Sequence, residues 1–77
     1  MTEEKIKERL LQNSQEFRKI YEEHQRCEQS LAGLRSRSFL TEEERLQEKV
    51  LKKKKLRLKD EMYQMILEFE RQSGRNV

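Results

Sequence analysis

Apolar residues recur along the second half of the chain in alternating steps of four and three. From Leu51 onward an apolar residue or a lysine occupies every position of this series, at 51, 55, 58, 62, 65 and 69. This spacing places all members on one side of an α-helix and is typical of a helix that packs lengthwise against another. The series predicts a long final helix, from about residue 41 to about residue 72.

The same pattern appears earlier, with steps of three and four. Its members are Phe17, Ile20, His24, Cys27, Leu31 and Leu34. They predict a helix over about residues 15–35. A turn is expected at about 36–40, where Arg35 to Ser38 offers polar connecting residues. Thr41 is followed three residues later by Glu44, a spacing typical of a capping box that starts a helix.

The N-terminal stretch predicts a short helix over about residues 3–12, with Thr2 as its cap. Asn13 with Glu16 forms a second capping-box pattern, which favours a break before the next helix. Because neither Asn13 nor Ser14 interrupts a helix as proline would, one continuous helix is the alternative. Residues 73–77 are expected to fray as a tail.

Two long amphipathic helices with a short connection between them favour an antiparallel arrangement. The sequence therefore predicts an all-α fold: an antiparallel, coiled-coil-like two-helix hairpin with a short N-terminal helical extension, in a single domain of residues 1–77. The expected register brings together five apolar layers: Leu34 with Leu46, Cys27 with Leu51, Ile20 with Leu58, Phe17 with Met62 and Leu10 with Phe69. One layer is polar, since His24 faces Lys54 or Lys55.

Composition agrees with a helical protein. Charged residues make up 43% of the chain and hydrophobic ones 32%, with no proline and only two glycines. A net charge of +3 is small beside 18 basic and 15 acidic residues, so the chain is not polybasic. The single cysteine excludes an internal disulfide and fits a reducing compartment. No apolar run reaches the roughly 20 residues of a membrane span, and the first residues carry no secretion signal, so we expect a cytoplasmic protein without membrane contact.

The most distinctive charged segment holds six basic residues, which we call the basic strip: Lys52, Lys53, Lys54, Lys55, Arg57 and Lys59. Such a segment is a candidate anion-binding site, because basic side chains along a helix can follow a nucleic-acid backbone. The competing interpretation is a solvated helix face whose lysine stems cover apolar surface. We favour the latter, since no aromatic residue is interleaved to stack on a base.

The sequence shows no residue pattern that is typical of a catalytic site or a metal site. His24 and Cys27 lie one turn apart, but zinc needs further ligands and the chain has no second histidine or cysteine. No glycine-rich phosphate loop is present, and Asp60 and Glu61 have no nucleophile beside them. We therefore expect no enzyme, no metal, no cofactor and no small-molecule substrate.

The segment Leu51-Lys-Lys-Lys-Lys-Leu-Arg-Leu-Lys-Asp-Glu-Met62, together with Phe17 and Tyr21-Glu-Glu-His24, resembles the YdcH-like family of small bacterial helical-hairpin proteins. The resemblance covers about residues 10–70. Gln15 departs from the family pattern, where proline is frequent, and so does Cys27, where leucine is commoner. The resemblance implies a bacterial α-hairpin, sometimes oligomeric, and no particular activity.

These observations lead to two functional hypotheses. In the first, the chain is a small non-enzymatic interaction protein that binds another protein or itself, as a weak homodimer. The expected partner surface comprises Leu56, Met62, Tyr63, Met65, Ile66, Leu67 and Phe69. The alternative is nucleic-acid or anionic-surface binding through the basic strip.

Overall fold

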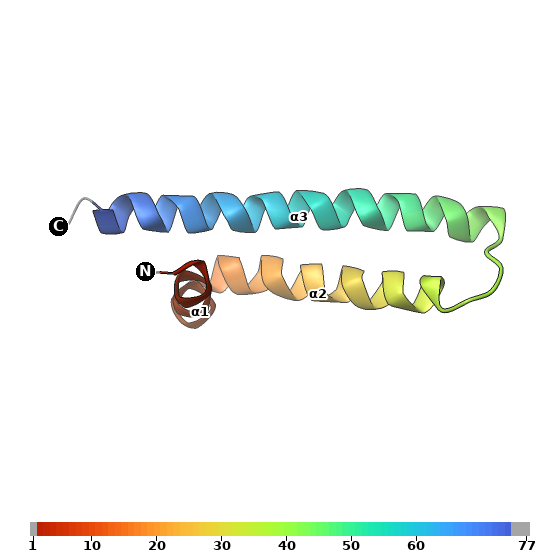
Figure 1. Cartoon of the computed structure of the whole chain (residues 1–77), viewed down its shortest axis with the longest axis horizontal. Coiled ribbons are helices and arrows are strands. Elements are labelled where there is room, and N and C mark those ends of the chain that lie inside the picture. The colour runs from red at the N-terminus through yellow and green to blue at the C-terminus, as the bar shows by residue number, and fades with distance from the viewer. Residues whose placement is uncertain (1, 75–77) are drawn as a thin grey trace.

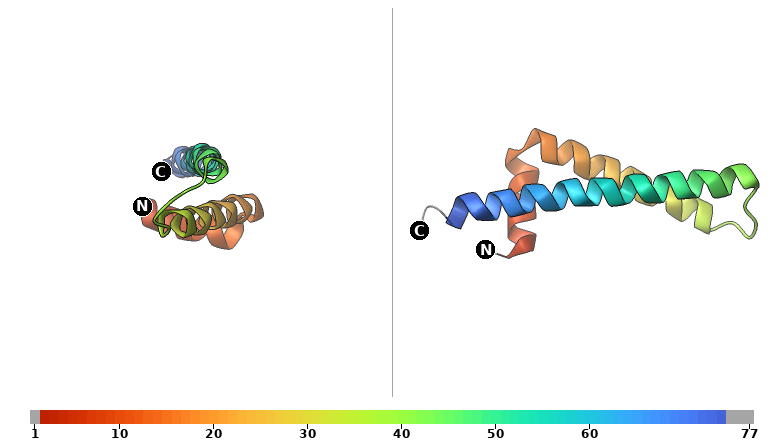
Figure 2. Two further views of the ribbon diagram at one scale, coloured as in Figure 1. Left: turned by 90° about the vertical axis from the view of Figure 1, so that its right-hand side faces the viewer. Right: turned by 90° about the horizontal axis from the view of Figure 1, so that it is seen from above.

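Three helices make up the computed structural model, which describes residues 2–74. Helix α1 spans Glu3–Asn13, α2 spans Gln15–Arg35 and α3 spans Glu42–Gly74. The all-α prediction is therefore confirmed. The molecule is elongated, measuring 54 × 20 × 17 Å. Helix α3 begins after the loop and runs back along α2 (Figure 1), and α1 and α2 lie together on one side of it (Figure 2).

One residue separates α1 from α2. Ser14 has an extended backbone; its N–H donates to the carbonyl of Leu10, and its hydroxyl accepts a hydrogen bond from the backbone N–H of Phe17 at 3.1 Å. Ser14 thus ends the first helix and caps the second. The expected capping box of Asn13 and Glu16 is wrong, because Asn13 is the last residue of α1. The break lets α1 turn and cross beneath α3 (Figure 2).

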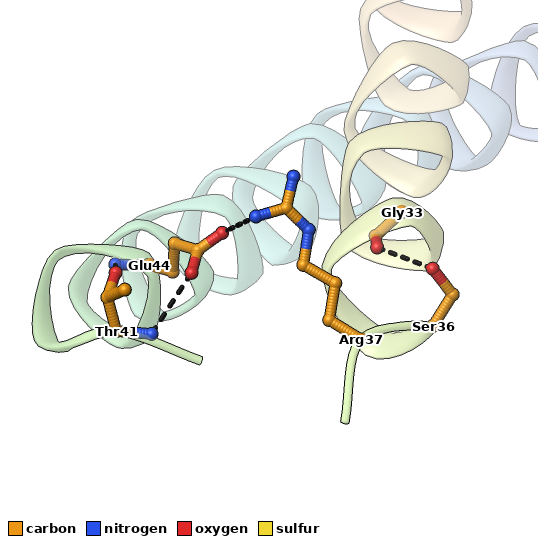
Figure 3. Close-up of polar contacts among 5 residues, drawn as sticks. All are labelled: Gly33, Ser36, Arg37, Thr41 and Glu44. Atoms are coloured by element: carbon orange, nitrogen blue, oxygen red, sulfur yellow. Dashed lines mark hydrogen bonds and ion pairs between the residues drawn. The ribbon is translucent and has the colours of Figure 1, made fainter. Parts of the chain in front are cut away.

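The loop between α2 and α3 is held by its own polar contacts (Figure 3). The hydroxyl of Ser36 donates to the carbonyl of Gly33 at 2.8 Å. Thr41 and Glu44 form the expected capping box: each backbone N–H donates to the other's side chain, at 3.0 and 3.1 Å. The guanidinium of Arg37 also pairs with the carboxylate of Glu44, joining the loop to the start of α3.

Every residue of the two apolar series is buried or half-buried. We call these facing sides of α2 and α3 the seam. Leu58 and Met62 are its buried members on α3, while Leu51 and Lys55 are half-buried. The three-and-four spacing therefore predicted correctly which side of each helix faces its neighbour.

One layer of the expected register is wrong. Leu34 is buried, but Leu46 is 64% exposed and cannot cover it. Continued toward the loop in steps of three and four, the α3 series reaches Glu48 and Glu44, both half-buried. Leu46 lies on the other side of the helix, since five residues from Leu51 correspond to well over a full turn. The positions of α3 on the seam side at this end are therefore glutamates, and Leu40 of the loop is also half-buried here.

The main core lies where all three helices meet. It is built from Ile6 of α1, Phe17 of α2, and Met62 and Ile66 of α3, with Leu10 and Phe69 among the residues packed against it. Ile6 and Phe17 are almost completely buried. The N-terminal segment is therefore an integral third helix, and the expected two-helix hairpin with an extension understates it.

Helix α3 continues two residues beyond the expected end, to Gly74. Of the tail predicted to fray, residues 75–77 lie outside the described residues. Within the described residues, no helix combines the length and apolarity needed to cross a membrane.

Candidate interaction surface

Among the residues that the structure describes, five large apolar side chains remain exposed to solvent. They are Phe39 (89%), Leu56 (65%), Leu46 (64%), Val50 (58%) and Tyr63 (49%). Phe39 lies in the loop and the other four lie on α3. We call Leu46 and Val50 the outer face of α3, because they lie one turn apart on the side away from the seam. Leu56 and Tyr63 lie roughly a quarter turn or more around the helix, and Tyr63 lines a cavity beside Phe17 and Met62. In Figure 1 no helix lies on the side of α3 away from α2.

The predicted partner surface is only partly exposed. Met62 and Ile66 are buried in the core of the chain itself, so they are not free to bind a partner. Met65, Leu67 and Phe69 are half-buried, and only Leu56 and Tyr63 are exposed. Phe17 of α2 packs with Met62 across the seam, and α1 adds Ile6 to the cover over this end of α3.

Sequence reasoning missed the three residues near the loop: Phe39, Leu46 and Val50. The expected register places Leu46 in the seam, and the expected turn includes Phe39. A signal was available, since Leu46 and Val50 are four residues apart and neither belongs to the series through Leu51 and Leu58. Two apolar residues one turn apart and off the seam form a second, narrow stripe.

The basic strip does not form one continuous positive face. Successive residues on a helix point about 100° apart, so adjacent lysines radiate in different directions. Lys52 lies 3.9 Å from Glu48 on the same helix, and the Nζ of Lys55 lies 3.0 Å from the Oε1 of Glu28 on α2. Lys53, Lys54, Arg57 and Lys59 are exposed. Part of the positive charge is thus neutralised within the molecule.

The ion pair between α2 and α3 also affects acid–base behaviour. A hydrogen bond from Lys55, together with its positive charge, lowers the pKa of the Glu28 carboxyl. At the loop, a hydrogen bond from the backbone N–H of Thr41 is the largest influence lowering the pKa of the Glu44 carboxyl. Both carboxylates therefore favour the charged form in the folded chain.

His24 occupies the predicted polar layer. It is half-buried, and its Nε2 is buried without a hydrogen-bond partner in the described structure. Burial is the main reason that its pKa is lowered; Lys55, Lys59 and Lys7 act in the same direction, and Glu28 opposes them. Of the two lysines expected opposite His24, Lys54 and Lys55, it is Lys55 whose charge lowers the pKa of the ring.

A cavity of about 350 Å³ adjoins this layer between the three helices. His24, Phe17 and Tyr21 of α2 and Met62 of α3 contribute to its walls, and Lys7 of α1 lies 5.2 Å from the centroid of the Tyr21 ring. Its rim carries both signs of charge, with Lys7 and Lys59 beside carboxylates. Because positive and negative side chains lie side by side there, the charge around the cavity is not complementary to any one class of ligand.

Cys27 is buried in the seam, as expected for a small apolar side chain at such a position. Among the described residues, no group of three or more histidine, cysteine, aspartate or glutamate side chains could hold a metal ion.

Comparison with known proteins identifies the family. The model of a family described as proteins of unknown function (DUF465) matches residues 17–66. The YdcH-like small bacterial proteins belong to it, so the resemblance drawn from the sequence is confirmed. The chain belongs to this family. The match covers α2 and most of α3 and leaves out α1. No curated protein and no solved structure matches the chain.

Proposed function

We propose that this member of the DUF465 family is a small, non-enzymatic interaction protein whose partner packs a helix against the outer face of α3. The observation that carries the proposal is the exposure of Leu46 and Val50, one turn apart on the side of α3 away from the seam, with Phe39 exposed just before the helix. Scattered apolar residues are common on protein surfaces, but two large ones that share an uncovered side of one helix resemble a narrow helix-docking stripe.

The unequal cover of α3 supports the same conclusion. At the end where α1 packs, the core is closed by Ile6, Phe17 and Met62 from three helices. Near the loop, α3 packs against α2 alone, and its other side remains apolar at Leu46 and Val50. A partner helix there would supply the third element that α1 supplies at the other end.

Nucleic-acid binding through the basic strip is the weaker candidate. Lys52 and Lys55 are engaged by Glu48 and Glu28, and the remaining basic side chains point in several directions. Binding to phosphates through such a strip would also show a steep dependence on salt concentration.

Site-specific photocrosslinking in cells tests the proposal. A photoreactive residue replacing Leu46 should give discrete crosslinks to protein, including copies of this chain, that survive nuclease treatment. The same residue replacing the exposed Glu22 on α2 is the matched control and should give none. Equal crosslinking from both positions, or products released by nuclease, would count against a protein-binding outer face.

A further inference from the structure

The charges along α3 are arranged in blocks around its exposed apolar stripe. The helix begins with Glu42, Glu43 and Glu44, presents Leu46 and Val50 outward, and then enters the basic strip at Lys52. An acidic block, an apolar centre and a basic block thus follow one another along a single helix.

From this order we propose that the loop end of α3 binds a second copy of the chain, with the two α3 helices antiparallel. The proposal rests on the outer face being an interaction surface and identifies its partner. In an antiparallel pair with two-fold symmetry, a contact between two positions occurs twice, once in each direction. Leu46 of one copy then packs on the partner's Val50, and Val50 packs on the partner's Leu46.

This apolar match fixes the position of every other residue across the interface. Four-residue spacing places Leu46 and Val50 on one side of the helix, and the series continues through Lys53 and Arg57. Moving outward from the apolar centre by equal steps, Glu43 lies across from the partner's Lys53. Opposite charges therefore meet on both sides of the apolar centre.

Other arrangements of the same helices lose this complementarity. In a parallel pair, Glu43 would face the partner's Glu43 and Lys53 the partner's Lys53. An antiparallel pair centred on Lys53 would bring the two basic strips together. Like charges across an interface disfavour both alternatives.

The surroundings leave room for the second copy. The contact involves the loop end of α3, whereas α1 lies at the far end (Figures 1 and 2). Phe39, the most exposed large apolar side chain, lies just before α3 and extends the apolar area on the same end of the molecule. The contact spans few turns of helix, so association is expected to be weak.

Sedimentation equilibrium with charge-reversed variants of the full chain tests the pairing. Glu43→Lys and Lys53→Glu should each weaken self-association about tenfold, because each reversal converts two attractions into two repulsions. The double variant Glu43→Lys with Lys53→Glu should restore it. Only an antiparallel pair with this register predicts the restoration. Arg18→Glu, an exposed reversal on α2, is the matched control and should leave association unchanged.

The outcomes separate this inference from the proposed function. A wild-type chain that stays monomeric at millimolar concentration overturns self-pairing, and so does a double variant no better than the single ones. Crosslinks from the outer face to other proteins would leave the proposed function standing in that case. Loss of those crosslinks as well would overturn both.

Discussion

Lys55 of α3 reaches across the seam to Glu28 of α2, with 3.0 Å between Nζ and Oε1. Lys55 therefore occupies a seam position that the spacing predicts to be apolar, and its ammonium group pairs with the Glu28 carboxylate at the edge of the seam. Its stem packs in the half-buried interior while the charge stays near solvent. This ion pair and His24 form the polar layer between the apolar parts of the seam.

The first prediction concerns this ion pair. Glu28→Gln should destabilise the chain slightly at low salt, because Lys55 loses its partner. The difference from wild type should vanish in about 1 M salt, where exposed charges are screened. Glu22→Gln, on the same helix, is the control and should show less salt dependence. Urea unfolding at both salt concentrations measures the effect, and a destabilisation that persists at high salt would contradict it.

The second prediction concerns the junction between α1 and α2. Ser14→Ala should lower the free energy of unfolding by about 1 kcal/mol, because the N–H of Phe17 loses the hydroxyl that accepts its hydrogen bond. Ser30→Ala, at an exposed position inside α2, should be neutral or slightly stabilising. Equal effects of the two substitutions would show that Ser14 does not cap α2.

The third prediction tests whether α1 is part of the core. Ile6→Ala should cost about 2–4 kcal/mol of stability, since it opens a cavity among Phe17, Met62 and Ile66. Leu46→Ala removes a similar side chain from an exposed position and should change stability by less than about 0.5 kcal/mol in dilute solution. If Ile6→Ala were equally mild, α1 would be a loose extension.

The fourth prediction follows from His24. Burial and the charges of Lys55, Lys59 and Lys7 outweigh Glu28, so the folded pKa lies below the unfolded value of about 6.5. The unfolded chain then binds the extra proton, and stability falls as pH drops below that value. An NMR titration of the single histidine gives the pKa directly, and a value above 6.5 would reverse the sign.

His24→Gln provides the control for this pH dependence. It removes the titrating ring and should flatten the change in stability between about pH 7 and pH 5 that the histidine causes. The residual slope at lower pH belongs to carboxylates such as Glu28 and Glu44. Their lowered pKa values add stability that is present above the unfolded pKa and is lost as pH falls through the folded one.

Periodicity predicted most of the seam because burial between two long helices selects one side of each helix. Phe17, Cys27 and Leu58 needed no knowledge of other elements to be placed there. The capping box of Thr41 and Glu44 was equally local, and so was the start of α3. Features that depend on three or four neighbouring residues were therefore predictable.

The remaining features depend on how α1 packs. The sequence of α1 shows an apolar edge, but it does not say that Ser14 turns the chain so that Ile6 reaches Phe17 and Met62. The expected register brings Leu10 of this segment to Phe69 and Met62 to Phe17, but it does not bring Ile6 into the same core, so the predicted partner surface includes Met62 and Ile66. The expected position of Leu46 is wrong for a different reason: toward the loop the seam series of α3 falls on Glu48 and Glu44, so hydrophobic patterning points to a nearby leucine on the other side of the helix.

A dilution series followed residue by residue in ¹⁵N NMR spectra tests the central claim most directly, because it locates the surface that responds to concentration. We expect shifts confined to the loop end of α3, at residues 42–57 and around Phe39, with Ile6 and Phe17 unchanged. Shifts centred on Met65 and Phe69 or on α1, or no shift at all up to millimolar concentration, would contradict the claim that α3 pairs through this outer face.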